Sequence, residues 1–135
     1  MQAMTDIRRA VEKRLASISP SLPTAYEAVK FTPPDTMYQV VNLLPRKPVD
    51  PVYNAGYHRE DVQLQVFVID KVGDGVLNAV QRAELIRDTF AKGTLIVEGS
   101  TNIFVLSTPA IAGNTIASDR LVVPILIDLT AEVVS

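Results

Sequence analysis

The residues with the clearest chemical potential lie between 58 and 61, where the single histidine precedes two carboxylates. A histidine beside a carboxylate can act as a general base, because its ordinary pKa lies near neutrality. Successive side chains of a strand point to opposite sides, so His58 and Glu60 should share a face that Asp61 does not. No serine or cysteine motif accompanies the pair. A small hydrolase using His58 with Glu60 is one hypothesis, and an exposed histidine at the entry of a strand is the other.

Residues 70–75 begin like a calcium-binding loop, with Asp70 and Asp74 around a glycine-containing turn. Such a loop requires Asp or Asn at its third position and Glu at its twelfth, where this chain has Val72 and Gln81. Too few oxygen ligands remain to replace the water around the ion. We therefore predict a strand-to-helix turn that Asp74 caps, and we expect no metal or cofactor.

Basic residues gather near the N-terminus, at Arg8, Arg9, Lys13 and Arg14, and such a group could attract phosphate. Glu12 interrupts the group, and the predicted helix has no aromatic side chain to stack on bases, so a solvated helix face is the preferred interpretation. The formal net charge of −2 supplies no global field for nucleic acid. We expect no direct nucleic-acid readout.

Length and composition favour a single domain over residues 1–135. Of the 135 residues, 47% are hydrophobic and 21% are charged, which is typical of a soluble globular chain. The chain has no cysteine, which excludes disulfide bridges and thiolate metal sites. No apolar run approaches the ~20 residues of a membrane span, and the N-terminus lacks the apolar centre of a signal peptide. We therefore expect a cytoplasmic, soluble protein.

Hydrophobic periodicity predicts two helices, at residues 6–17 and 76–91. Thr5 is predicted to cap the first helix, and the charged residues of the second, including Arg82, are assigned to its solvent face. The inner stripes consist of Ile7, Val11, Leu15 and Ile18 in the first helix and Ala79, Ala83, Ile86 and Phe90 in the second.

Strand-like stretches surround both helices. They lie at residues 25–31, 37–44, 61–70, 95–97, 103–106 and 120–129, with a loop at 107–118. Strands grouped in this way indicate an α+β fold with a mainly antiparallel sheet and two helices packed on one face. The predicted order of elements is α-β-β-β-α-β-β-β.

The last predicted strand carries Pro124 in its middle, which favours an edge or bulged position. Both of its faces are apolar, and an uncovered edge of this kind is an aggregation hazard. Burial against another subunit would remove that hazard, and a head-to-tail contact that closes would give a ring. The alternative is that the protein's own loops cover the second face.

A long proline-rich segment, residues 45–57, separates two of the predicted strands. Loops longer than about 12 residues without structure of their own are usually functional or disordered. Prolines stiffen this one, which lowers the entropic cost of docking. Its tyrosines are either interface anchors or packed onto the sheet. We predict a protein–protein interface that includes Arg46, Lys47, Asp50, Tyr53, Tyr57, His58 and Arg59.

Stretches spaced along the chain carry a family resemblance. They are MTDIRRAVEKRL at 4–15, FTPP at 31–34 leading to YQVVNLLP at 38–45, GYHRE at 56–60, RAELIRDTF at 82–90 and LVVPI at 121–125. Together they resemble the tail terminator-like (tail completion) proteins of long-tailed bacteriophages and prophages. The resemblance spans nearly the whole chain, as an order of elements with scattered side chains rather than a reactive motif.

This resemblance implies a small α+β structural protein of the virion tail, assembled in the bacterial host cytoplasm, with no enzymatic activity and no cofactor. It implies a ring, usually of six subunits, that caps the tail tube, halts its polymerisation and presents a surface to the head–tail connector. The partners would be copies of the same chain, the tube protein and the connector protein. The alternatives are another neck or tail protein, such as a connector-stopper or a tube subunit, and the hydrolase based on His58 and Glu60.

Overall fold

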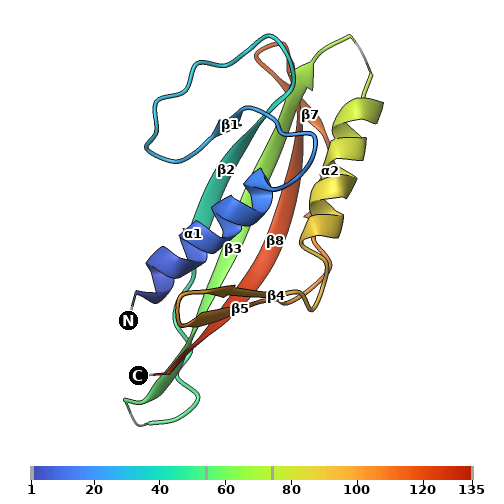
Figure 1. Cartoon of the computed structure of the whole chain (residues 1–135). Helices are drawn as coiled ribbons and strands as arrows, with labels where there is room; N and C mark the ends of the chain where they lie inside the picture. Colours follow the sequence, from blue (N-terminus) through green and yellow to red (C-terminus); the bar gives the residue numbers. More distant parts are fainter. Residues whose placement is uncertain (1, 54, 74, 135) are drawn as a thin grey trace.

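The computed structural model describes residues 2–53, 55–73 and 75–134, and Figure 1 shows two helices on one face of a long, twisted sheet. The helices are α1 (Ala3–Ala16) and α2 (Leu77–Thr89). The strands are β1 (Thr24–Ala25), β2 (Tyr38–Pro45), β3 (Tyr57–Lys71), β4 (Leu95–Glu98), β5 (Thr101–Val105), β6 (Ala110–Ile111), β7 (Thr115–Ala117) and β8 (Arg120–Val134). The predicted α+β class and the order of helices among strands are confirmed.

Two strands of 15 residues each, β3 and β8, form the centre of the sheet. They pair antiparallel along their whole length, from Tyr57 opposite Val134 to Lys71 opposite Arg120. β2 lies on the far side of β3, and the short β1 runs parallel to β2. On the far side of β8 lie β7, β6 and β5 in succession, and β4 pairs with β5 to complete that edge.

The core lies between the two helices and one face of this sheet. Both predicted helical stripes are buried there, as are the apolar residues that alternate along β3 and β8. Burying one such Leu, Ile or Phe side chain stabilises the fold by about 1.5–3 kcal/mol relative to exposure. The residues of β2, β3 and β8 that alternate with the buried ones form an outer face, which is half-buried and has no helix over it (Figure 1).

The prediction that the last strand lies at an edge is wrong, because β8 has neighbours on both sides. Pro124 lies opposite Phe67, and its carbonyl accepts a hydrogen bond from the N–H of Ala112 at 2.9 Å. The N and C=O of one strand residue point to the same side, so the missing N–H of Pro124 faces the gap between β6 and β7. One ladder bond is lost there, the one that an N–H at position 124 would donate to the carbonyl of Ala112, but β8 is still paired on both sides, so the edge-strand argument for a ring does not apply to it.

Two further expectations about loops and strands need correction. The predicted loop at 107–118 contains β6 and β7, both paired with β8. β7 reaches β8 through Ser118 and Asp119, whose φ angles of 50° and 59° fit a two-residue hairpin turn. The predicted strand at 25–31 is reduced to β1, because the chain turns after it and the N–H of Val29 donates to the carbonyl of Tyr26 at 3.2 Å.

The predicted helix caps also differ from the structure. Thr5 is not an N-cap, because α1 begins earlier, at Ala3. The carboxylate of Asp6 instead accepts a hydrogen bond from the hydroxyl of Thr101 at 2.8 Å, which ties α1 to the β4–β5 hairpin. The predicted cap of the second helix, Asp74, lies outside the described residues.

Candidate interaction surface

The proline-rich segment is a projecting hairpin rather than a long irregular loop. We call residues 46–56 the arm. The N–H of Arg46 donates to the carbonyl of Asp61 at 2.9 Å, and Val49 and Arg59 exchange two backbone hydrogen bonds of 2.9 and 2.8 Å. The three residue steps from Arg46 to Val49 therefore lie opposite the two residue steps from Asp61 to Arg59, which is the geometry of a β-bulge. The prolines lack the N–H that would complete a regular ladder.

The far part of the arm is strongly exposed. Tyr53 is 110% exposed and Val52 is 44% exposed, so neither packs onto the sheet. Tyr57 is half-buried at the start of β3, opposite Val134. Of the two interpretations of these tyrosines, Tyr53 therefore fits an exposed anchor and Tyr57 fits packing on the sheet.

The predicted interface residues gather at one end of the sheet, but on different sides of it. Lys47 and Asp50 lie exposed on the arm with Tyr53. Arg46 and Arg59 make ion pairs on the outer face, to Asp128 at 3.6 Å and to Asp61 at 3.1 Å. His58 lies on the opposite, helix-covered face, because it pairs in register with the buried Val133.

The outer face near the arm is a polar ladder. Asp61 accepts hydrogen bonds from Arg59 at 3.1 Å and from Thr130 at 2.7 Å. One row further along, Gln65 donates to Gln63 at 3.0 Å, and Gln63 donates to Asp128 at 3.1 Å. Cross-strand pairs of this kind stabilise a sheet that has no cover, so this region fits a water-exposed surface.

His58 and Glu60 share a face as predicted, and Nε2 of His58 lies 2.9 Å from Oε1 of Glu60. They line an open pocket of about 440 Å³ together with the first turn of α1. This geometry would orient an imidazole, but catalysis by acyl transfer also requires a nucleophile. Among the residues that the structure describes, no hydroxyl or thiol is hydrogen-bonded to His58. Within the part of the chain that the structure describes, the pair therefore has no hydrogen-bonded nucleophile of the kind that the hydrolase hypothesis needs.

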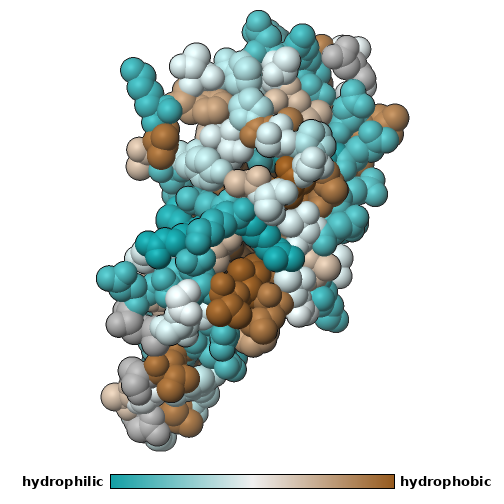
Figure 2. Space-filling model, viewed as in Figure 1, coloured by the Kyte–Doolittle hydropathy of each residue, from teal (hydrophilic) through white to brown (hydrophobic). Residues whose placement is uncertain are grey.

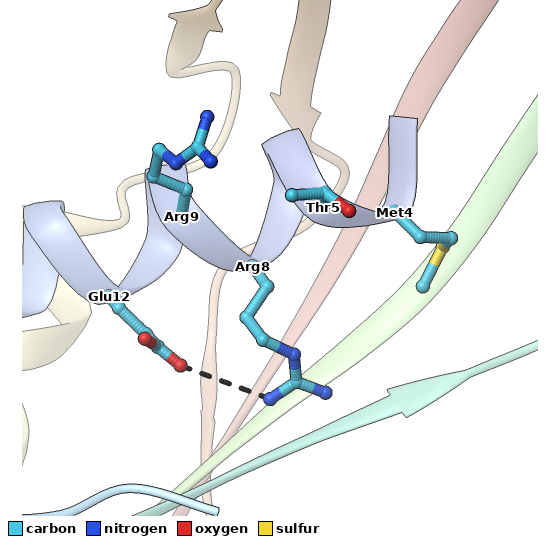
Figure 3. A pocket seen from close by; sticks show the side chains of 5 residues that line it. All are labelled: Met4, Thr5, Arg8, Arg9 and Glu12. Atoms are coloured by element: carbon cyan, nitrogen blue, oxygen red, sulfur yellow. Dashed lines mark ion pairs between the residues drawn. The ribbon is translucent and has the colours of Figure 1, made fainter. Parts of the chain in front are cut away.

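The basic residues of α1 are structural links. Figure 3 shows Arg8 pointing toward Glu12, 3.9 Å away, in a pocket of about 430 Å³, and Arg8 also meets Glu27 at 3.1 Å. Lys13 pairs with Glu98 at 3.0 Å. Arg14 donates to the carbonyl of Thr89, at the end of α2, at 2.8 Å. Each guanidinium or ammonium already has an oxygen partner, so this face does not fit a phosphate site.

The β4 edge is a surface that sequence reasoning missed. The N–H of Val105 donates to the carbonyl of Thr94, so alternation directs the amides of Leu95 and Val97 away from β5. Their side chains are 51% and 59% exposed. Figure 2 shows a hydrophobic patch over β4, beside α1. The apolar spacing predicted a strand here, but only the order of strands in the sheet reveals it as an edge.

Sequence reasoning also misplaced Arg82. This residue was assigned to the solvent face of α2, but it is only 6% exposed. It follows the buried Ala79 by three positions, so the helical spacing that identified the stripe also allows its burial. The prediction that Arg82 faces solvent rested on its charge alone.

Two classes of feature are absent from the described residues. Within 2–53, 55–73 and 75–134, no group of three or more His, Cys, Asp or Glu side chains is placed to hold a metal ion. In the same ranges, neither helix is long and apolar enough to cross a bilayer.

Comparisons with known proteins agree with this geometry. A family model described as "Phage tail terminator protein" matches residues 6–128. One solved structure has a TM-score of 0.77 to this chain and 25% sequence identity, and the alignment covers 97% of this chain and 96% of that one. No curated protein matches the sequence significantly.

Proposed function

The chain belongs to the phage tail terminator protein family, and on that premise we propose that it caps the tail tube, ends tube polymerisation and offers a surface for joining the head. The observation that carries this proposal is the family match over residues 6–128. The chain is accordingly a structural component of a phage tail, from a family that acts by contact rather than by turnover.

We further propose that the protein works as a ring, of six subunits as the family resemblance implies, seated on the tube and facing the connector. The arm and the β4 edge support this proposal, because each offers unpaired groups or exposed apolar side chains at the periphery of the sheet. Assembly would take place in the host cytoplasm and leave the protein in the virion tail. The residues proposed for contact remain Arg46, Lys47, Asp50, Tyr53, Tyr57, His58 and Arg59.

The direct test is the length of tails in particles that lack this protein. We expect electron micrographs to show tails longer than those of wild-type particles, and expression of the intact chain in the same host should restore normal length. Tails of normal length without the protein would contradict the capping role.

The same micrographs separate the neighbouring functions. A connector-stopper acts after the tube is complete, so its loss would leave tail length unchanged while heads and tails stay apart. A tube subunit would polymerise by itself into long open filaments, since its head-to-tail contacts do not close. Purified protein that forms only short closed species is therefore expected for a terminator.

A further inference from the structure

A pocket of about 260 Å³ lies between the first half of α2 and the segment that follows α1. Pro20, Leu22, Met37 and Leu85 supply its apolar walls, and Arg82 forms part of the lining. An apolar pocket with one cation in its wall is suited to a ligand that combines apolar surface with a negative charge.

Arg82 has a single hydrogen-bond acceptor among the described residues. Its Nη1 donates to the carbonyl of Pro20. Its Nε and Nη2 are buried and have no hydrogen-bond partner among the described residues. Burial lowers the pKa of Arg82, but a guanidinium remains charged at any physiological pH. An uncompensated buried charge is strongly destabilising, and no carboxylate of the described residues neutralises this one.

We propose that this pocket binds a carboxylate side chain from a second copy of the chain, that of Asp50 on the arm. The inference rests on the proposed function, because it assigns the arm a contact within the same assembly. A carboxylate can accept two parallel hydrogen bonds from a guanidinium, and such charge-assisted bonds are shorter and stronger than neutral ones. The unpartnered nitrogens of Arg82 call for this kind of acceptor, which reaches them once the side chains that cover them in the free chain move aside.

Asp50 fits the pocket by charge and by its neighbours. Within the described residues its carboxylate has no cation or hydrogen-bond donor, whereas Glu27, Asp61 and Glu98 are each paired inside the chain. Pro48, Val49, Pro51 and Val52 flank Asp50 and provide the apolar surface that the pocket walls require. Their stiffness lowers the entropy lost when the arm docks.

The arm lies at one end of the long strands, and the elements that line the pocket, the first half of α2 and the segment that follows α1, lie toward the other end (Figure 1). A copy that receives an arm in its pocket therefore still presents its own arm to the next copy. This is a head-to-tail contact, which forms a ring when its rotation closes.

The first test compares stability with association for Arg82→Met. The thermal midpoint of the isolated chain should be unchanged or higher, because the substitution removes an unpaired buried charge. Self-association measured by sedimentation should weaken by at least about tenfold, since loss of one partner leaves the other charge of the pair buried and unpaired. Arg87→Met on the same helix is the matched control, because Arg87 already has the carbonyl of Pro109 as acceptor at 3.0 Å. A purely structural Arg82 would lower the midpoint without this effect on association.

The second test mixes two variants. Asp50→Asn retains a working pocket, and Arg82→Met retains a working arm, so a mixture can form one contact per pair and nothing larger. Asp35→Asn, an exposed acid outside the arm, is the control for Asp50→Asn and should associate like wild type. Larger species in the mixture would contradict the proposal.

The deciding experiment uses the absence of cysteine in the chain. Val52→Cys, an exposed arm position that leaves Asp50 in place, combined with Gln81→Cys, which places the second thiol in the pocket lining, should give a ladder of cross-linked multimers on oxidation, while either substitution alone should give none. The ladder is sought both with purified protein at high concentration and in particles. No ladder in either preparation overturns the inference. Tail length in particles lacking the protein is an independent readout of the capping role. A result that contradicts the arm contact therefore leaves the capping role intact, and tails of normal length would contradict capping without bearing on the arm contact.

Discussion

The two edges of the sheet are built differently. At the β2 edge, the N–H of Gln39 donates to the carbonyl of Pro23 at 3.0 Å, and the N–H of Leu43 donates to the carboxylate of Glu27 at 2.6 Å. Pro45 ends the strand without a donor. At the β4 edge, the amides of Leu95 and Val97 face outward and exposed apolar side chains flank them. One edge is closed to a further strand and the other is open.

This difference shows how a small sheet can leave only one of its two edges able to pair with a strand of another chain. An edge with unpaired amides is a template for another chain, and natural proteins block such edges with charges, prolines or covering segments. Here the carboxylate of Glu27 and the ring of Pro45 block β2, while β4 has no comparable device among the described residues. The hairpin that carries β4 is held to α1 by Asp6 with Thr101 and by Lys13 with Glu98.

The largest effect should come from removing the support beneath the open edge. Ile103, in β5 of the hairpin that carries this edge, is fully buried, and Ile103→Ala should lower the free energy of unfolding by about 2–5 kcal/mol through lost burial and a cavity. Leu95→Ala, at a half-exposed position on the partner strand, should cost less than about 1 kcal/mol. Chemical denaturation of both variants measures the contrast. Equal losses would mean that the edge is no more exposed than the core.

An intermediate effect is expected when the open edge is blocked as β2 is. Val97→Lys should leave the thermal midpoint unchanged, because the side chain is exposed, but should reduce incorporation into tails by about tenfold, or about 1.4 kcal/mol of binding. Immunoblots of purified particles measure incorporation. Val72→Lys, at an exposed position outside β4, is the control. Normal incorporation of Val97→Lys would show that assembly does not use this edge.

The smallest effect concerns the closed edge and depends on pH. The hydrogen bond from the Leu43 N–H, helped by Arg8, lowers the pKa of Glu27 below its ordinary 4.5. The unfolded chain therefore takes up this proton first, so the stabilisation is fully present above pH 4.5 and is lost as pH falls through the folded pKa. Glu27→Gln should remove this part of the acid dependence and cost less than about 1 kcal/mol at neutral pH. Urea unfolding at a series of acidic pH values measures this contribution of Glu27, with Glu84→Gln at an exposed position as the control. If Glu27→Gln unfolded with the same pH dependence as the wild-type chain, the contribution would be contradicted.

Local patterns predicted the parts of the fold that depend on local physics. The stripes of both helices and the alternation in β3 follow from periodicity, and all three are buried as expected. Sheet order depends on pairing between distant segments, so Pro124 suggested an edge that β6 and β7 remove. β6 has two residues and β7 has three, which is too short for hydrophobic alternation to predict a strand.

The candidate surface was predictable to a similar degree. Alternation placed His58 and Glu60 on one face, and the structure brings them within hydrogen-bonding distance. The prolines indicated a stiff segment, but the pairing of Val49 with Arg59 depends on how the segment folds back on β3, which no local pattern predicts. The burial of Arg82 contradicts the usual preference of charge for solvent. Residues that break a local rule in this way are expected at functional or strained sites, which is why the burial of Arg82 bears on function.

The full-length pairing of β3 with β8 has a mechanical consequence. A load applied between the arm and the opposite end of the molecule runs parallel to these strands, so their backbone hydrogen bonds resist it together in shear rather than opening one after another. Such a chain would transmit tension along its length, which suits a structural component of a phage tail.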